Sequence, residues 1–225
     1  MPVKELNFGR DGAWHLPACV GPAEQGRILA ALESLPAGSA GVRIYGAAEL
    51  RPLLARDGSV GAVASAVLGG ACRPVRAVLF DKSQKTNWGL GWHQDRTIAV
   101  AARVDVPGFG PWTVKAGVVH VAPPFEVLER MVTLRVHLDA VPESNAPLLV
   151  ALGSHRLGRI AEGDVARVVS ECARLTCTAE AGDIWLYATP ILHASDAAAL
   201  PSRRRVLQID YADFDLPSGL EWFGI

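Results

Sequence analysis

The sequence has little net charge, no long hydrophobic run and no regular cysteine spacing. Its 225 residues include 22 basic and 23 acidic side chains, so the overall charge gives no case for binding nucleic acid or an anionic membrane. The longest apolar stretches, such as residues 60–68, contain Gly, Ala and Ser and are too short to span a bilayer. The segment 1–5 lacks the apolar core of a signal peptide. These absences predict a cytoplasmic protein without a membrane partner.

Disulfide bonds are also not expected. Cys19, Cys72, Cys172 and Cys177 form neither a C-x-x-C pair nor a regular spacing, which is typical of reduced, mostly buried thiols in a cytoplasmic protein. Apolar residues make up 50% of the chain and charged residues 20%, a balance typical of a globular protein. No repeat, low-complexity tract or linker divides the sequence, so residues 1–225 predict one domain.

Helical patterns come first in the chain, and short strands follow. After a strand at 13–16, helices are expected at 22–35 and within 47–68. The later strands are expected from alternation and β-branched residues, and they lie at 74–81, 97–104, 131–140, 148–152, 175–179, 184–187 and 204–212, with a short apolar segment at 117–121. Helices are also expected at 125–129 and 164–172, and loops at 88–96, 107–112 and 142–147. This order predicts a mainly β protein, a sandwich or barrel with helices packed against one sheet.

The most informative stretch is Trp88–Arg96, a glycine-rich segment that carries a His-x-Asp pair. In an extended backbone His93 and Asp95 point the same way while Gln94 turns aside. With His193 they make two histidines and one carboxylate, the facial triad that binds non-haem Fe(II) and leaves positions open. A His-x-Asp pair alone is weak evidence, because His137 and Asp139 repeat it in an apolar strand. We interpret His137 as a structural or supporting residue.

Arg203, Arg204 and Arg205 begin the last expected strand, shortly after His193 and Ser195. A guanidinium is the natural bidentate partner of a carboxylate. Alternation turns Arg204 to the face opposite that of Arg203 and Arg205. The triple arginine is equally compatible with a solvated sheet edge.

Taken together, these residues resemble the phytanoyl-CoA dioxygenase-like Fe(II)/2-oxoglutarate oxygenases. The most specific pieces are Trp92-His-Gln-Asp95, the turn Gly153-Ser154-His155, and the eleven-residue step from His193 to Arg204. The likeness runs from Asp11-Gly-Ala-Trp14 to Gln208-Ile-Asp-Tyr211. It implies a double-stranded β-helix, a jelly-roll or cupin-like barrel.

The resemblance also implies a set of roles. His93, Asp95 and His193 would bind Fe(II), Arg204 and Ser195 would bind the distal carboxylate of 2-oxoglutarate, and Gln94 would lie near this cosubstrate. The implied reaction uses O2 and oxidises an unactivated C–H bond of a small molecule, with release of succinate and CO2. Because related halogenases have a small residue at the position of Asp95, a carboxylate there favours hydroxylation or another oxidation such as desaturation or ring closure.

One departure from the family concerns Arg135, which stands where a cosubstrate-contacting Trp is common. A charged side chain inside a barrel needs a partner, so Arg135 contacts 2-oxoglutarate, contacts an anionic substrate, or lies on the other face. A smaller departure is Ala146, where Gly is frequent.

The substrate is expected to be a small molecule that carries a carboxylate or phosphate. Loop residues near the expected mouth suggest an aromatic and cationic wall, and these residues are Trp88, Arg96, Trp112 and Lys115. Two other functions stay open: a cupin-like metalloenzyme that does not use 2-oxoglutarate, and a non-catalytic β-sandwich that binds a ligand. No feature of the sequence indicates an oligomeric state.

Overall fold

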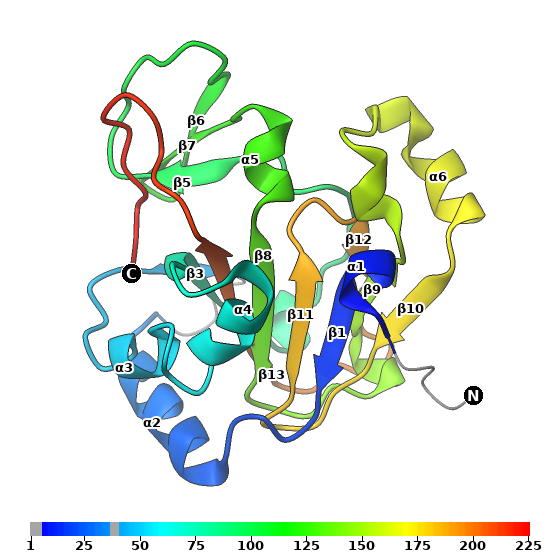
Figure 1. Cartoon of the computed structure of the whole chain (residues 1–225). Coiled ribbons are helices and arrows are strands. Elements are labelled where there is room, and N and C mark those ends of the chain that lie inside the picture. The colour runs from blue at the N-terminus through cyan, green and yellow to red at the C-terminus, as the bar shows by residue number, and fades with distance from the viewer. Residues whose placement is uncertain (1–5, 37–40) are drawn as a thin grey trace.

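The larger of two facing sheets has six antiparallel strands in the order β1-β11-β8-β13-β3-β2 (Figure 1). The computed structural model describes residues 6–36 and 41–225. In spatial order, the strands of this sheet are Ala13–Leu16 (β1), Ile184–Ala188 (β11), Val132–His137 (β8), Arg204–Ala212 (β13), Arg73–Lys82 (β3) and Val42–Ile44 (β2).

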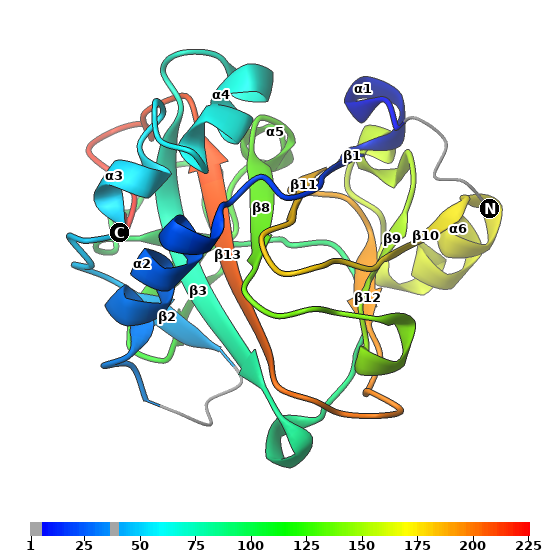
Figure 2. The same ribbon diagram turned by 90° about the horizontal axis from the view of Figure 1, so that it is seen from below.

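A smaller sheet of four strands stands across from the larger one, in the order β10-β9-β12-β4 (Figure 2). Its strands are Arg174–Cys177 (β10), Leu148–Ala151 (β9), His193–Ser195 (β12) and Leu90–His93 (β4). A third sheet of three strands contains Ile98–Val100 (β5), Val118–Val121 (β7) and Trp112–Lys115 (β6).

Alternation along the larger sheet separates a helix-covered face from a face turned towards the smaller sheet. Ala77, Leu79, Leu134 and Leu207 are buried in one apolar cluster with residues of the N-terminal helices. These helices are α2 (Pro22–Leu32), α3 (Arg51–Leu54) and α4 (Gly61–Leu68), and they lie on the side away from the smaller sheet (Figure 2). Because side chains alternate, the intervening residues of β3, β8 and β13 face the space between the two sheets.

Short helices occupy the connections between strands. They are α1 (Phe8–Asp11), α5 (Phe125–Glu129) and α6 (Val165–Glu171), with the 3-10 turns Gln84–Thr86, Glu143–Asn145, Ser154–Leu157 and Glu162–Asp164. Within the described ranges 6–36 and 41–225, the helices are too short or too polar to cross a membrane. The four cysteines are free.

Several elements predicted from the sequence have the same first and last residues in the structure, namely the strands 13–16 and 204–212 and the helix 125–129. Others were wrong. The expected loop 88–96 contains strand β4, the strand expected at 97–104 is only Ile98–Val100, and strands β2, β6 and β12 were not foreseen. Strand β4 is held extended by pairing with β12, an interaction between distant segments that local glycine content cannot reveal.

Candidate active site

Two histidines face each other on the last two strands of the smaller sheet, β12 and the edge strand β4. In the pairing of β4 with β12, His93 lies directly opposite His193, so both side chains emerge on the same face. Their ring centroids are 4.3 Å apart. Asp95 follows two residues after His93, and the ligand atoms of these three residues all lie within 4.8 Å of one another. The structure therefore brings together the three residues that the sequence singled out.

Backbone carbonyls set the orientation of both imidazoles. Nδ1 of His93 lies 2.8 Å from the Gly91 carbonyl oxygen, and Nδ1 of His193 lies 2.9 Å from that of Ile191. A carbonyl oxygen only accepts hydrogen bonds, so each Nδ1 carries the proton and donates it. Each Nε2 is left with its lone pair, which is the arrangement seen for metal-binding histidines.

The charges of the trio also suit a metal ion. Burial lowers the pKa of His193 to about 4, so this imidazole is neutral at neutral pH. Burial alone would raise the pKa of Asp95, but nearby positive charges, first those of His193 and Arg76, outweigh it and lower that pKa. Metal ligands must be deprotonated. Neutral imidazoles with an ionised carboxylate form the donor set of non-haem Fe(II) sites, so the residues present fit this ion.

The side-chain amide of Gln94 forms a brace, a set of hydrogen bonds that holds the backbone around the trio in place. Its nitrogen donates to the carbonyl oxygens of Gly158 (3.0 Å) and Pro190 (2.8 Å), and its oxygen accepts from the Ile160 N–H (2.9 Å). These bonds tie the segment of His93 to the segment that leads into β12. The structure does not place Gln94 in the cavity, against the expectation that it lies near a cosubstrate, because its position between two inward residues turns it outward.

Ser154 gives a second brace. Its hydroxyl donates to the Ala151 carbonyl oxygen at 2.7 Å and accepts from the Leu192 N–H at 2.9 Å. It therefore fixes the backbone immediately before His193. The Gly-Ser-His turn of the sequence thus supports the trio indirectly.

A cavity of about 280 Å³ lies between the two sheets, next to the trio. Part of its wall is apolar, formed by Val78, Phe80, Trp88, Leu90 and Leu148. The rest is strongly cationic, with the side chains of Arg43, Arg76, Lys82, Arg135 and Arg204. His93, Asp95, His193 and Ser195 also line this cavity.

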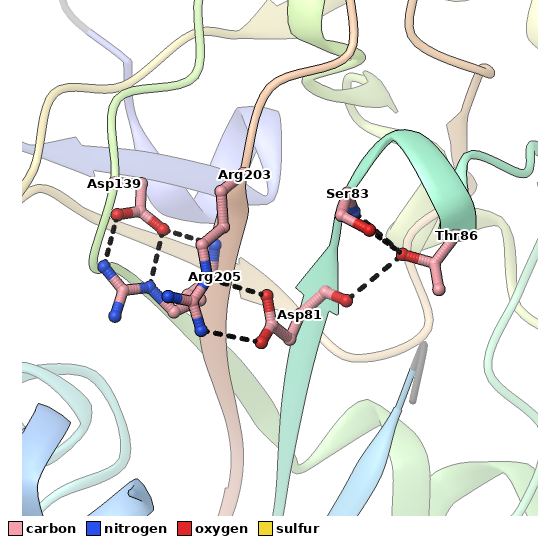
Figure 3. Close-up of polar contacts among 6 residues, drawn as sticks. All are labelled: Asp81, Ser83, Thr86, Asp139, Arg203 and Arg205. Atoms are coloured by element: carbon pink, nitrogen blue, oxygen red, sulfur yellow. Dashed lines mark hydrogen bonds and ion pairs between the residues drawn. The ribbon is translucent and has the colours of Figure 1, made fainter. Parts of the chain in front are cut away.

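Arg204 is the arginine of the triplet that points inward. Arg203 binds Asp81 at 3.1 and 3.3 Å, and Arg205 binds Asp139 at 2.6 and 2.9 Å, outside the cavity (Figure 3). Arg204 is only 4% exposed and lines the cavity. The alternation predicted from the sequence is therefore correct, and two carboxylates hold its outward-facing neighbours in place.

Lys82 joins Arg204 at one end of the cavity, and Arg135 lies further along the sheet, in the row of Gln208 and Val78. Lys82 lies opposite Arg204 in the sheet, and its Nζ donates to the Trp88 carbonyl oxygen at 2.7 Å. Arg135 donates to Oε1 of Gln208 at 2.8 Å. Burial, and then the charges of Arg204 and Arg135, lower the pKa of Lys82 to about 8. Cations gathered without a matching carboxylate in this way form a site for an anion.

Ser195 and Trp88 also lie where the sequence placed them. The Ser195 hydroxyl lines the cavity and makes a long contact of 3.4 Å with the Ala146 carbonyl oxygen. Trp88 lines the mouth with its indole 38% exposed, and Lys82 stacks over this ring at 4.1 Å.

The other three residues of the expected substrate wall lie outside the cavity. Arg96 donates to the Ile160 carbonyl oxygen at 2.7 Å, and Trp112 packs against the apolar cluster of the third sheet. Lys115 is exposed and contacts Oγ1 of Thr97 at 3.4 Å. None of the three lines this cavity, and their contact with a substrate stays a prediction.

His137 is buried but does not line the cavity. Both its ring nitrogens lack a hydrogen-bond partner among the described residues, and burial lowers its pKa to about 3. The interpretation as a structural residue stays a prediction.

Sequence reasoning missed several residues that line the cavity, among them Arg43, Arg76, Lys82 and Gln208. Arg76 and Lys82 share the parity of Val78 on a strand whose alternation is clear in the sequence, so that pattern could have revealed them. Arg43 lies on a strand of three residues, which is too short to leave a periodic signal.

Three solved structures share the fold. AviO1 from Streptomyces viridochromogenes Tue57 is 22% identical, with a TM-score of 0.66 over 94% of each chain. EctD from S. alaskensis, crystallised with 2-oxoglutarate and 5-hydroxyectoine, is 18% identical, with a TM-score of 0.69 over 100% of this chain and 82% of that one. The epimerase SnoN, in complex with Fe3+, alpha ketoglutarate and nogalamycin RO, is 20% identical, with a TM-score of 0.66 over 94% and 88%.

These likenesses confirm the predicted jelly-roll fold. A search of the curated proteins found no match. A family comparison matches residues 8–206 to the family described as Phytanoyl-CoA dioxygenase (PhyH). The match covers most of the sequence and includes every residue of the trio. The chain belongs to the phytanoyl-CoA dioxygenase family.

Proposed function

We propose that the protein is an Fe(II)- and 2-oxoglutarate-dependent oxygenase that hydroxylates an unactivated C–H bond of a small molecule. One observation carries this proposal: the His-Asp-His trio and the cationic group around Arg204 line the same cavity from opposite sheets. The relatives EctD and SnoN, crystallised with 2-oxoglutarate and with iron and alpha ketoglutarate, support the same pair of ligands here.

His93, Asp95 and His193 would bind the metal. Each Nδ1 donates to a backbone carbonyl, which directs Nε2 at the metal, and the lowered pKa of Asp95 keeps its carboxylate ionised. When bound, Fe(II) with 2-oxoglutarate and O2 supplies the oxidative decarboxylation to succinate and CO2 that drives oxidation of the substrate.

The other end of the cavity would bind the distal carboxylate of 2-oxoglutarate. Arg204 offers a planar fork for a bidentate contact, Lys82 adds a second positive charge, and the Ser195 hydroxyl can rotate to donate. Arg135 donates to an amide oxygen and lies over the Phe80 ring at 5.4 Å, and its Nε is buried without a partner among the described residues. Of the options that the sequence left for Arg135, contact with this carboxylate fits best, because its charge is felt by both Lys82 and Arg204.

The outcome that we propose is hydroxylation. The carboxylate of Asp95 fills the position that halogenases of the family leave small, so chloride would have no place beside the metal. SnoN is described as an epimerase, which illustrates that other oxidations occur on this fold. The substrate therefore decides the finer outcome.

The test is an anaerobic titration with Fe(II) and 2-oxoglutarate, followed through the visible charge-transfer band of their chelate. The wild type is expected to give the band, His93→Ala to lose it, and Arg204→Gln to need at least about ten-fold more 2-oxoglutarate, because a charge-assisted contact is lost. Arg203→Gln is the matched control and should behave as the wild type, since Arg203 faces away from the cavity.

Two outcomes would contradict the proposal. Iron binding without the band would favour a cupin-like metalloenzyme that does not use 2-oxoglutarate. Absence of stoichiometric iron binding would favour a non-catalytic ligand-binding protein.

A further inference from the structure

The cavity holds a second group of cations that the proposed function does not use. Arg43 on strand β2 lies opposite Val78 of β3, so its side chain shares a face with Arg76, two residues away on β3. Both guanidinium groups line the cavity. Arg76 is neutralised by Asp210 at 2.7 Å. Arg43 forms no salt bridge with any described residue, and its Nε is buried without a hydrogen-bond partner.

This second group is separate from the cations expected to bind 2-oxoglutarate. Val78, opposite Arg43, and Lys82, opposite Arg204, are four residues apart on β3, a spacing of roughly 13 Å at about 3.3 Å per residue. Arg135 shares the row of Val78, but strands β13 and β3 lie between it and Arg43. The charges of Lys82, Arg135 and Arg204 act on one another, whereas the only charge that affects the pKa of Arg43, after burial, is that of Arg76. A dicarboxylate at the Arg204 end would therefore leave Arg43 without a counter-charge.

The Arg43 end lies on the metal side of the cavity. Arg76 lies in one row of the larger sheet with Asp210, Thr133 and Tyr187, and the Tyr187 ring is 5.6 Å from the ring of His193. A molecule held beside Arg43 would thus lie near the proposed iron. Its body would meet an apolar wall, because Val78 and Phe80 line the cavity from β3, and Leu90 lines it from β4.

We propose that Arg43 anchors an oxyanion of the substrate, so that the enzyme acts on small amphipathic molecules with one carboxylate or phosphate and an apolar body. Arg43 is partly buried, and its buried Nε has no hydrogen-bond partner among the described residues, which is unfavourable. A bidentate oxyanion is the group that best satisfies a guanidinium fork. The single uncompensated positive charge selects one anionic group. This inference rests on the proposed function for its reaction, but not for its binding site.

The test compares three probes that share a phenyl ring. Phenyl phosphate and benzoate carry an anionic group, and phenol is the probe without one. Calorimetry on anaerobic protein with Fe(II) and saturating 2-oxoglutarate keeps the Arg204 end occupied. At least one of the two anions is expected to bind at least about ten-fold more tightly than phenol, and Arg43→Gln should remove this preference. Arg203→Gln, which removes an exposed cation outside the cavity, should change each affinity less than about two-fold. The stronger of the two anions identifies the oxyanion.

The inference is overturned if phenol binds as well as both anions, if no probe binds, if Arg43→Gln keeps the preference, or if Arg203→Gln weakens it equally. Arg43→Met is the second variant if Arg43→Gln does not fold, with the same expected result. The charge-transfer band is recorded on the same samples. If the band forms but Arg43→Gln keeps the preference for the anions, only this inference is contradicted. If Arg43→Gln removes the preference but no band forms, only the proposed function is contradicted.

Discussion

At the scale of single residues, the orientation of the histidines has a local origin. His93 and His193 each direct Nδ1 at the carbonyl two residues earlier. His120 does the same with Val118 at 2.9 Å, yet among the described residues it belongs to no cluster of potential metal ligands. The contact by itself therefore does not mark a metal site. What distinguishes the proposed metal site is the pairing of two such histidines with Asp95.

The metal affinity should depend steeply on Asp95. We expect Asp95→Ala to weaken Fe(II) binding by more than about 100-fold, since loss of a supporting residue already costs 10–100-fold, and to abolish metal-dependent turnover. Competition with a coloured chelator under anaerobic conditions measures the affinity. Asp105→Ala, at an exposed carboxylate, is the control. Wild-type affinity in Asp95→Ala would remove Asp95 from the ligand set.

The charge of Lys82 should make 2-oxoglutarate binding depend on pH. Because the anion prefers protonated Lys82, whose pKa in the free protein is about 8, affinity should be constant below that pH and fall above it. The free energy of unfolding of the free protein should instead rise between about pH 8 and 10.5. In this range the unfolded chain keeps the proton of Lys82 and the folded protein has lost it. The charge-transfer titration, repeated across this range, checks the first expectation, and urea unfolding checks the second.

Lys82→Met is the matched variant for both measurements. It should bind 2-oxoglutarate more weakly at neutral pH and lose the decline above pH 8. A decline that persists unchanged in Lys82→Met would assign the pH dependence to another group.

At the scale of secondary structure elements, the site depends on how two segments are held together. Gln94 lies between the two ligands of the first segment and bonds to the backbone before β12, while Ser154 bonds to Leu192 within that same backbone. Neither side chain lines the cavity. Both act by fixing the position of His193 relative to His93.

Gln94→Leu should therefore weaken both the fold and the metal site. The substitution leaves two carbonyls and one N–H of the buried brace unpaired, which we expect to cost on the order of 2–4 kcal/mol in the free energy of unfolding. Fe(II) affinity should fall by about 10–100-fold, as for other residues that support metal ligands. Urea denaturation and chelator competition measure the two effects. Gln84→Leu, at an exposed glutamine, should alter neither, and unchanged iron binding in Gln94→Leu would contradict the role as a brace.

Element length decided which parts of the fold could be predicted. The strands around residues 74–81 and 204–212 are long enough to show alternation, so the inward position of Arg204 could be derived from sequence alone. Strands β2 and β12 contain three residues each, and their extension comes from pairing with distant strands. That is why Arg43 could not be foreseen.

The candidate site was predictable to a similar degree. The trio followed from local spacing together with the family resemblance. The positions of Arg96 and Trp112 outside this cavity could not be foreseen, because loop composition does not tell which way a side chain faces. Gln94 was correctly expected to turn aside from the ligands, and the same geometry takes it away from the cosubstrate end.

At the scale of the whole molecule, the two sheets contribute different parts of the site. The trio comes from β4, β12 and the residue Asp95 just beyond β4, on the smaller sheet. Arg204 and Lys82 come from the larger sheet, whose other face is covered by helices α2 to α4 (Figure 2). A ligand that contacts both the metal and Arg204 would therefore join the two sheets. That residues 1–225 form one domain stays a prediction.

Thermal unfolding should report this coupling. A ligand at about 100 times its dissociation constant adds about 2.7 kcal/mol, which for a chain of this length corresponds to a rise in Tm of roughly 5–10 °C. We expect anaerobic Fe(II) to raise Tm, 2-oxoglutarate alone to do little, and the two together to exceed the sum of their separate effects, because chelation to the metal contributes to cosubstrate binding. Arg204→Gln should keep the increment from iron and lose most of that from 2-oxoglutarate, whereas Arg203→Gln should keep both. Equal increments from 2-oxoglutarate with and without iron would show that the cosubstrate does not bridge the two sheets through the metal.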